Sequence, residues 1–199
     1  MFLNQALDYK NPFWMYLLGS FVIIIFVIIG QLPITFFITK ESISAAGGDP
    51  MAALRSLDKN LQLILLLIPF LVGFLGLFLV VKKIHNRSLI SISTSRESLD
   101  WNRIIYAFSI WSLVSILLIT GDYFLNPDSY EWNFNFKSFS LLLIISISLM
   151  PIQTSLEEYI FRGYLMQGFY SFFNSRWGAL LLTSIVFGSL HFSNPEVQK

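Results

Sequence analysis

The sequence SFSLLLIISISLMPIQTSLEEYIFRGYLM, residues 138–166, decides the fold class and holds the most concentrated chemistry of this protein. Its first nineteen residues carry no charge. A helix rises about 1.5 Å per residue, so a run of this length comes close to the thickness of the hydrocarbon core of a bilayer. Glu157 and Glu158 follow the run directly, and Arg162 comes four residues after Glu158. The stretch therefore predicts a membrane helix with ionisable side chains toward one end.

Four other charge-free runs have a similar length and composition. Hydrophobic residues make up 55% of the 199 positions and charged residues only 13%, which is far from the usage of soluble proteins. A large soluble helical protein would show polar stripes on its helices, and these runs have none. We therefore expect an all-α, polytopic bundle of transmembrane helices in a single domain, residues 1–199. The five predicted spans are 11–39, 60–81, 104–121, 138–156 and 177–195.

The charges between these runs predict the orientation of the chain. The connection 82–103 carries five cations, whereas the connection 122–137 carries one cation beside three acidic residues. By the positive-inside rule, we expect the connection 82–103, the N terminus and the segment 162–176 to be cytoplasmic. The absence of cysteine excludes disulfides and thiolate chemistry. No basic stripe is present, so we expect no nucleic-acid partner.

The ionisable cluster predicts two different environments for its two carboxylates. Glu158 and Arg162 lie four residues apart, so they share a helix face and can form an ion pair. Glu157 is rotated by about 100° and points elsewhere. Because Glu157 has apolar neighbours and stands beside a like charge, it is our candidate general base. Pro151 should kink the same helix and open room beside it.

A second polar feature lies in the last apolar run. Phe187 and His191 share a helix face, and Gly188 is a small residue that would let another helix approach closely. We expect His191 to meet Glu157 inside the membrane, which requires the fourth helix to continue past Arg162. The other histidine lies in the basic connection, and we expect this residue, His85, to be solvated.

Each of these side chains also has a simpler interpretation. Glu158 and Arg162 would then form a structural salt bridge, Glu157 would be an interfacial carboxylate, and His191 would hydrogen-bond a neighbouring helix. Their occurrence together favours a catalytic site.

The two motifs together resemble the CAAX-protease and bacteriocin-processing (CPBP, or ABI) family of intramembrane glutamic endopeptidases, which includes the type II CAAX prenyl endopeptidases. The motifs are Glu157-Glu158-x-x-x-Arg162 and Phe187-x-x-x-His191, within a core of about 138–195. The resemblance implies that Glu157 activates a water that attacks a peptide carbonyl and that His191 helps to hold this water. Glu158 and Arg162 would organise the site, with Phe187 and Gly188 as structural support.

The resemblance also carries expectations beyond these residues. Family members have about eight membrane helices and a third motif, His-x-x-x-Asn or Asp, which has no counterpart here, so the chain resembles a C-terminally truncated N-terminal part. Whether it is active by itself stays open. The expected location is a bacterial inner membrane, with the lipid bilayer and a peptide substrate, prenylated or bacteriocin-like, as partners. No cofactor is expected.

Two other function classes stay open. A zinc-dependent membrane metalloprotease would use Glu157 and His191 as ligands, but catalytic zinc sites have three protein ligands and no further one is evident. A non-enzymatic scaffold or immunity-type protein would use the same cluster only to hold helices together. A transporter is disfavoured, because the charges gather at one site and no paired broken helices are evident.

Overall fold

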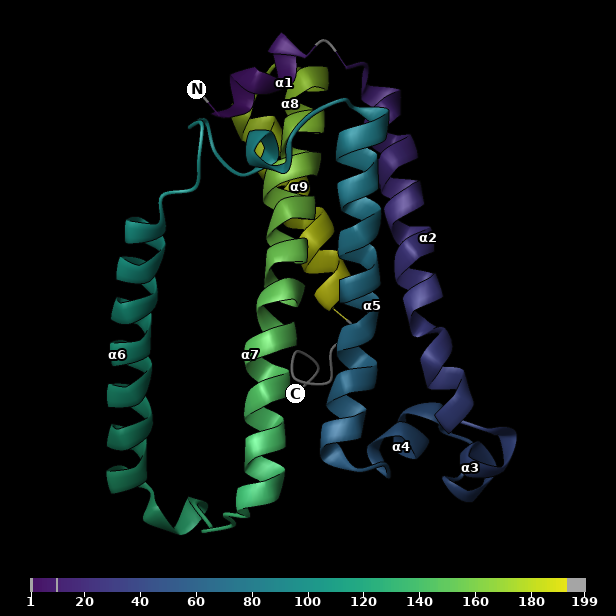
Figure 1. Cartoon of the computed structure of the whole chain (residues 1–199), viewed down its shortest axis with the longest axis vertical. Coiled ribbons are helices and arrows are strands. Elements are labelled where there is room, and N and C mark those ends of the chain that lie inside the picture. Colours follow the sequence, from purple (N-terminus) through teal and green to yellow (C-terminus); the bar gives the residue numbers. More distant parts are fainter. Residues whose placement is uncertain (1, 10, 193–199) are drawn as a thin grey trace.

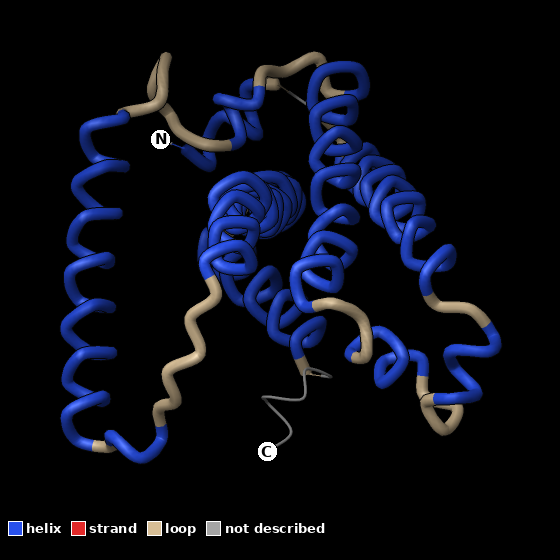
Figure 2. The backbone as a smooth tube through the Cα atoms, turned by 60° about the horizontal axis from the view of Figure 1, so that its bottom comes forward, coloured by secondary structure: helices blue, strands red, loops and turns tan. Residues whose placement is uncertain are grey.

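The computed structural model describes residues 2–9 and 11–192. In this part of the chain the secondary structure is helical, without strands (Figures 1 and 2). Four of its helical runs are long and apolar enough to cross a membrane, so the predicted all-α polytopic bundle is confirmed. These runs are α2 (Phe13–Phe37), α5 (Lys59–Leu79) with its π-helical end η2 (Val80–Ile84), α6 (Trp101–Leu125), and α7 (Phe136–Glu158) continued by the π-helix η5 (Tyr159–Leu165) and α8 (Met166–Phe173).

The predicted fifth span is a shorter helix that folds back on the fourth run. The run from α7 to α8 is 38 residues long, as expected if the fourth helix continues past Arg162. It ends at Asn174, whose left-handed backbone (φ 50°) reverses the chain. Helix α9 (Arg176–His191) then has only 16 residues and packs on α8. The rest of the predicted span, 193–195, lies outside the described residues.

Polar side chains define where most of these helices begin. In each case a side-chain oxygen just before the first helical turn accepts a hydrogen bond from a backbone N–H of that turn, which satisfies a donor that has no partner within the helix. These caps are Asp58 for α5, Asp100 for α6, Asn135 for α7 and Ser175 for α9.

The packed part of the bundle consists of α2, α5 and the long run from α7 to α8, with α5 between the other two. Glycines allow α2 and α5 to approach closely: a Cβ on Gly30 would lie 2.6 Å from the Cα of Pro69. The largest buried cluster lies toward one end of the bundle and contains Tyr16, Leu77 and Tyr164. This end therefore holds both the core and, as shown below, the charged motif.

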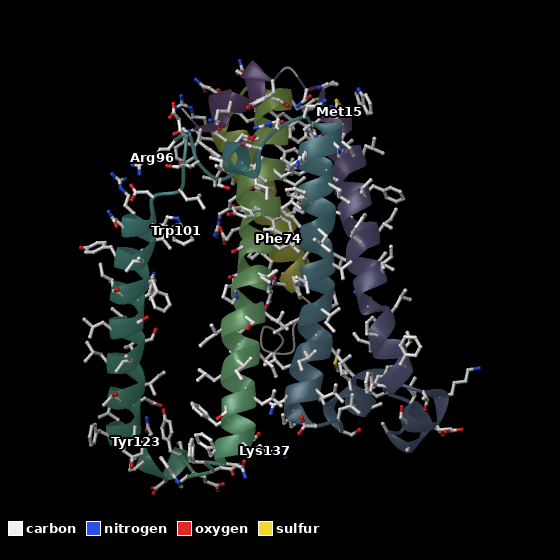
Figure 3. The ribbon with its side chains drawn as sticks, in the orientation of Figure 1. Met15, Phe74, Arg96, Trp101, Tyr123 and Lys137 are labelled. Atoms are coloured by element: carbon white, nitrogen blue, oxygen red, sulfur yellow. The ribbon has the colours of Figure 1, made fainter. Side chains whose placement is uncertain are left out.

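Helix α6 stands apart from this bundle. None of its residues is buried, and Figure 1 shows it separated from α7 along its whole length. Its side chains, from Trp101 to Tyr123, project on all sides (Figure 3). An apolar helical surface of this length is compatible with contact with membrane lipid.

The short elements gather at the two ends of the bundle. The helices η1 (Phe2–Asn4) and α1 (Gln5–Asp8) pack on α8 at one end, and η3 (Leu89–Ile92) contacts η5 nearby. At the other end lie α3 (Lys40–Ala45), α4 (Pro50–Arg55) and η4 (Pro127–Ser129) (Figure 1). The connections thus alternate between the two ends, as predicted from the order of the spans.

Candidate active site

The charged motif lies where the long helix changes from α-helical to π-helical geometry. Glu157 and Glu158 are the last two residues of α7, and Arg162 lies in η5. A π-helical turn holds extra backbone compared with an α-helical turn, and such turns are frequent at functional sites.

Glu158 and Arg162 form the predicted ion pair. Both side chains are well exposed, at 50% and 67% of their surface. The two residues belong to one continuous helical run, so their pair does not link separate helices of the bundle. The pair therefore fixes the direction of Arg162 more than it stabilises the fold.

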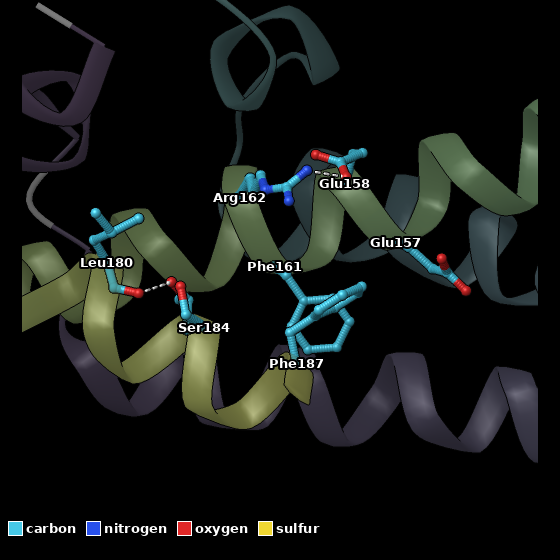
Figure 4. A pocket seen from close by; sticks show the side chains of 8 residues that line it. Glu157, Glu158, Phe161, Arg162, Leu180, Ser184 and Phe187 are labelled. Carbon is cyan, nitrogen blue, oxygen red and sulfur yellow. Dashed lines mark hydrogen bonds and ion pairs between the residues drawn. The ribbon is translucent and has the colours of Figure 1, made fainter. Parts of the chain in front are cut away.

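Glu157 points away from this pair, as expected from its rotation on the helix (Figure 4). Its side chain is partly buried, and the side-chain amide of Gln153, one turn earlier, donates a hydrogen bond of 3.4 Å to its Oε1. The two adjacent carboxylates thus have different surroundings.

Glu157 borders two cavities formed by the described residues. The first is lined by both motif carboxylates and Arg162 together with α9 residues, among them Thr183 and Phe187 (Figure 4). The second, of about 400 Å³, brings together three polar side chains, Gln153, Glu157 and His191. Its remaining lining is apolar and consists of Val27, Phe70, Leu156, Ile160, Phe161 and Leu190. The expectation that Glu157 and His191 meet is therefore supported by a shared cavity.

His191 is oriented by its own helix. Its Nδ1 lies 2.9 Å from the backbone oxygen of Phe187, and the two rings are in contact, with centroids 4.3 Å apart. A carbonyl oxygen only accepts hydrogen bonds, so Nδ1 carries the proton. In the neutral ring, Nε2 is then the nitrogen that can accept a hydrogen bond from a water.

The two predicted supporting residues, Phe187 and Gly188, differ in their contacts. Phe187 contacts Phe161 edge-to-face, with ring centroids 5.1 Å apart, and so joins α9 to the motif helix. Gly188 is expected to allow close helix approach; among the described residues no other element comes within 4 Å of a Cβ at this position, so its supporting role stays a prediction. Close approach occurs at Gly163 instead, against the backbone oxygen of Ile92.

The prediction that His85 is solvated is also wrong. This side chain is 4% exposed, and its Nε2 lies 2.8 Å from the hydroxyl of Tyr164. Burial, together with the nearby Arg87, lowers the pKa of His85 to about 4, so the ring is neutral at pH 7. The sequence offers one signal for this burial, namely the apolar segment Leu89–Ile92 just after it, which packs against η5 rather than staying in solvent.

The residues present do not complete a zinc site. Among residues 2–9 and 11–192, no group of three His, Cys, Asp or Glu side chains lies close enough to hold a metal ion. Glu157 and His191 share a cavity, but a catalytic zinc has three protein ligands.

Comparisons with known proteins support the resemblance based on the motifs. Residues 137–198 match the family model described as type II CAAX prenyl endopeptidase Rce1-like, and this region contains both motifs. Over 196 residues the chain is 31% identical to a Bacillus subtilis (strain 168) protein described as uncharacterized protein YyaK. The match covers 97% of this chain and 65% of that relative, so the chain spans somewhat less than two thirds of its length. No solved structure matches.

Proposed function

We propose that this chain carries the catalytic glutamate and histidine of an intramembrane endopeptidase of the CPBP type. One observation carries the proposal: Glu157 and His191, which belong to different helices, line one cavity. The family match over 137–198 supports the same reaction class.

The proposed reaction is the hydrolysis of a peptide bond by a water molecule in this cavity. The Glu157 carboxylate takes a proton from the water as the oxygen attacks the peptide carbonyl, and Nε2 of His191 accepts a hydrogen bond from the same water. The proton then passes from Glu157 to the amine that leaves. The negative charge on the carbonyl oxygen requires hydrogen-bond donors, and the Gln153 amide is the donor that the described cavity offers.

The cavity also suits one class of substrate. Its apolar lining favours a peptide segment with apolar side chains, entering from the membrane, and such a segment could be prenylated or bacteriocin-like. In the proposed orientation the motif end of the bundle faces the cytoplasm, because the cationic connection 82–103 lies at this end. The enzyme would then act near the cytoplasmic face of a bacterial plasma membrane.

The test uses the purified protein in proteoliposomes. A library of apolar peptides, with and without a farnesyl group, is incubated with wild type, Glu157→Gln and His191→Ala, and products are identified by mass spectrometry. Cleavage by wild type that both variants lose supports the proposal. The matched control is Glu131→Gln, which removes an exposed carboxylate in the connection before α7 and should cleave like wild type. Equal cleavage by Glu157→Gln and wild type would refute the glutamate mechanism.

The same assay separates the two other function classes. A zinc protease would lose cleavage on chelation with 1,10-phenanthroline and regain it on addition of zinc, whereas the proposed mechanism predicts no response. A scaffold would keep its function in the Glu157→Gln variant and would show no peptide cleavage in any variant.

A further inference from the structure

A buried arginine joins three elements of the bundle next to the charged motif. Arg87 lies in the connection after η2 and is 5% exposed. Its guanidinium donates hydrogen bonds to Tyr16 Oη of α2 at 3.1 Å and to Gln167 Oε1 of α8 at 2.6 Å. It also donates to Ser91 of η3, from Nε to the side-chain oxygen at 3.2 Å and from Nη2 to the backbone oxygen at 3.4 Å. One side chain thus links α2, η3 and α8.

A second group of contacts lies beside the first. The hydroxyl of Tyr164, a residue of η5 that is 1% exposed, lies 2.8 Å from His85 Nε2 and 3.3 Å from the backbone oxygens of Met15 and Tyr16. The rings of Tyr16, His85 and Tyr164 also contact one another, with centroids 4.7 to 5.3 Å apart. Together these contacts form the Arg87 network, which consists of Tyr16, His85, Arg87, Ser91, Tyr164 and Gln167.

The Arg87 network holds the same helical segment that carries the candidate site. Tyr164 and Gln167 follow Arg162 by two and five residues. Between them and the motif, Gly163 lies so close to Ile92 that a Cβ would be 2.4 Å from the Ile92 backbone oxygen. On another side of the segment, Phe161 contacts Phe187 of α9. The segment is therefore held by the network on one side and presents the site on another.

Stability by itself is a weak reason for a buried guanidinium. Removing a cation from water is unfavourable, and apolar side chains of similar volume often give an equally stable or more stable fold. The guanidinium instead fixes the relative orientation of its three partners, because its planar array of donors binds all of them at once. A π-helical turn requires contacts that hold it in place, because its geometry is less favoured than that of an α-helix.

We propose that Arg87 and Tyr164 are positioning residues, which fix the rotation of η5 so that Glu157 and Phe161 face α9. The catalytic meaning of this role rests on the proposed function, whereas the geometric claim does not. Neither residue touches the reacting atoms; both act through the helix backbone.

The test uses the absence of cysteine from the chain. A reporter pair, Phe161→Cys with Phe187→Cys, measures the contact between η5 and α9 as the rate of cross-linking by a short bifunctional thiol reagent. A control pair, Asn60→Cys with Ser138→Cys, measures a contact between α5 and α7 far from the network, where the two side chains are 3.3 Å apart. Both pairs are studied in membranes.

The decisive variant is Arg87→Met, which keeps the volume of the side chain but removes its donors. We expect the reporter pair to cross-link at least about fivefold more slowly, the factor that corresponds to one net hydrogen bond, and the control pair to be unchanged. An unchanged reporter pair would overturn the proposal, because Arg87 would then only fill space.

Arg87→Met could fail to fold, and both pairs would then lose cross-linking. A second variant decides this case. Tyr164→Phe removes a single hydroxyl and keeps the ring. A slower reporter pair with an unchanged control pair supports the proposal. An unchanged reporter pair, or a loss shared equally by both pairs, overturns it.

Peptide cleavage provides the catalytic readout once wild type is shown to cleave. We expect Arg87→Met to lower kcat more than it changes KM per folded molecule, and Arg87→Lys to restore kcat only in part, since a lysine cannot reproduce the planar array of donors. If wild type cleaves no peptide, the proposed function fails while the cross-linking result still decides the positioning claim.

Discussion

Helix α6 and the long run α7–η5–α8 are both apolar enough to cross a membrane, yet their surroundings differ completely. No residue of α6 is buried, whereas the long run contributes Leu156, Tyr164 and Gln167 to the interior. The long run also carries Glu157 and Arg162 next to a break in its α-helical geometry. Apolar length is therefore enough to make a helix suitable for a membrane, whereas packing into the bundle also requires contacts with other helices, such as those of Gly163 and Tyr164.

The largest expected effect lies in the long run and concerns catalysis. Glu157→Gln should lower the rate of peptide cleavage at least about 100-fold, because it removes the group that takes the proton from water in the proposed mechanism. The measurement is the initial rate of product formation in proteoliposomes. The substitution is isosteric, so thermal unfolding in detergent should stay close to that of wild type. If the Glu157→Gln variant cleaved within threefold of the wild-type rate, Glu157 would not be the general base. The long run would then differ from α6 in packing but not in catalysis.

The next effect is a loss of stability at acid pH, which originates from His85 beside the long run. Burial and the Arg87 charge lower the pKa of His85 from its ordinary 6.5 to about 4 in the folded protein. The His85 ring therefore binds a proton more readily in the unfolded chain than in the folded protein. The contribution of the neutral ring to the free energy of unfolding is complete above about pH 6.5 and is lost as the pH falls toward 4. We expect a decrease of up to about 3 kcal/mol across this range.

Thermal unfolding in detergent at pH 7 and at pH 4.5 measures this decrease. His85→Gln is the matched variant, because glutamine can still donate to the Tyr164 hydroxyl but does not titrate. It should lose clearly less stability on acidification than wild type does. The same loss in both proteins would show that other groups cause the acid sensitivity.

A pair of glycines sharpens the comparison directly. Gly163→Ala should destabilise the protein by about 1–3 kcal/mol, because the new Cβ would meet the Ile92 backbone oxygen at 2.4 Å. Gly121→Ala in α6 meets no atom within 4 Å and should be neutral or stabilising by up to about 1 kcal/mol. The unfolding temperature in detergent should therefore fall for Gly163→Ala and stay equal or rise for Gly121→Ala, and equal shifts would contradict the difference in packing.

The smallest effect is expected for the exposed ion pair. The described residues cover no more than about half of either side chain, and in the proposed orientation the pair lies in reach of cytoplasmic water, so Glu158→Gln should change stability by less than about 1 kcal/mol. Because the proposed role of Glu158 is to orient Arg162, Glu158→Gln should lower the cleavage rate far less than Glu157→Gln does. A loss as large as that of Glu157→Gln would assign the two carboxylates the same role.

Much of the site was predictable because its determinants are local. The spacing of four residues predicted the Glu158–Arg162 pair and the shared face of Phe187 and His191, since a helix repeats every 3.6 residues. The role of Gly188 cannot be derived in the same way. A small residue permits close approach without requiring it, and at this position the described chain brings no neighbour.

The sequence was enough to predict a membrane protein with two adjacent carboxylates and an arginine on one of its membrane helices. Each residue's preference for lipid or water, and its direction on a helix, depend only on itself and its near neighbours. The packed bundle was needed to show that His85 and Arg87 are buried, that α6 stands apart and which apolar side chains line the cavity shared by Glu157 and His191. Their partners lie far away in the sequence: Arg87 binds Tyr16 and Gln167, 71 and 80 positions distant. Burial of a polar group depends on whether such partners converge, and that convergence is a property of the packed bundle.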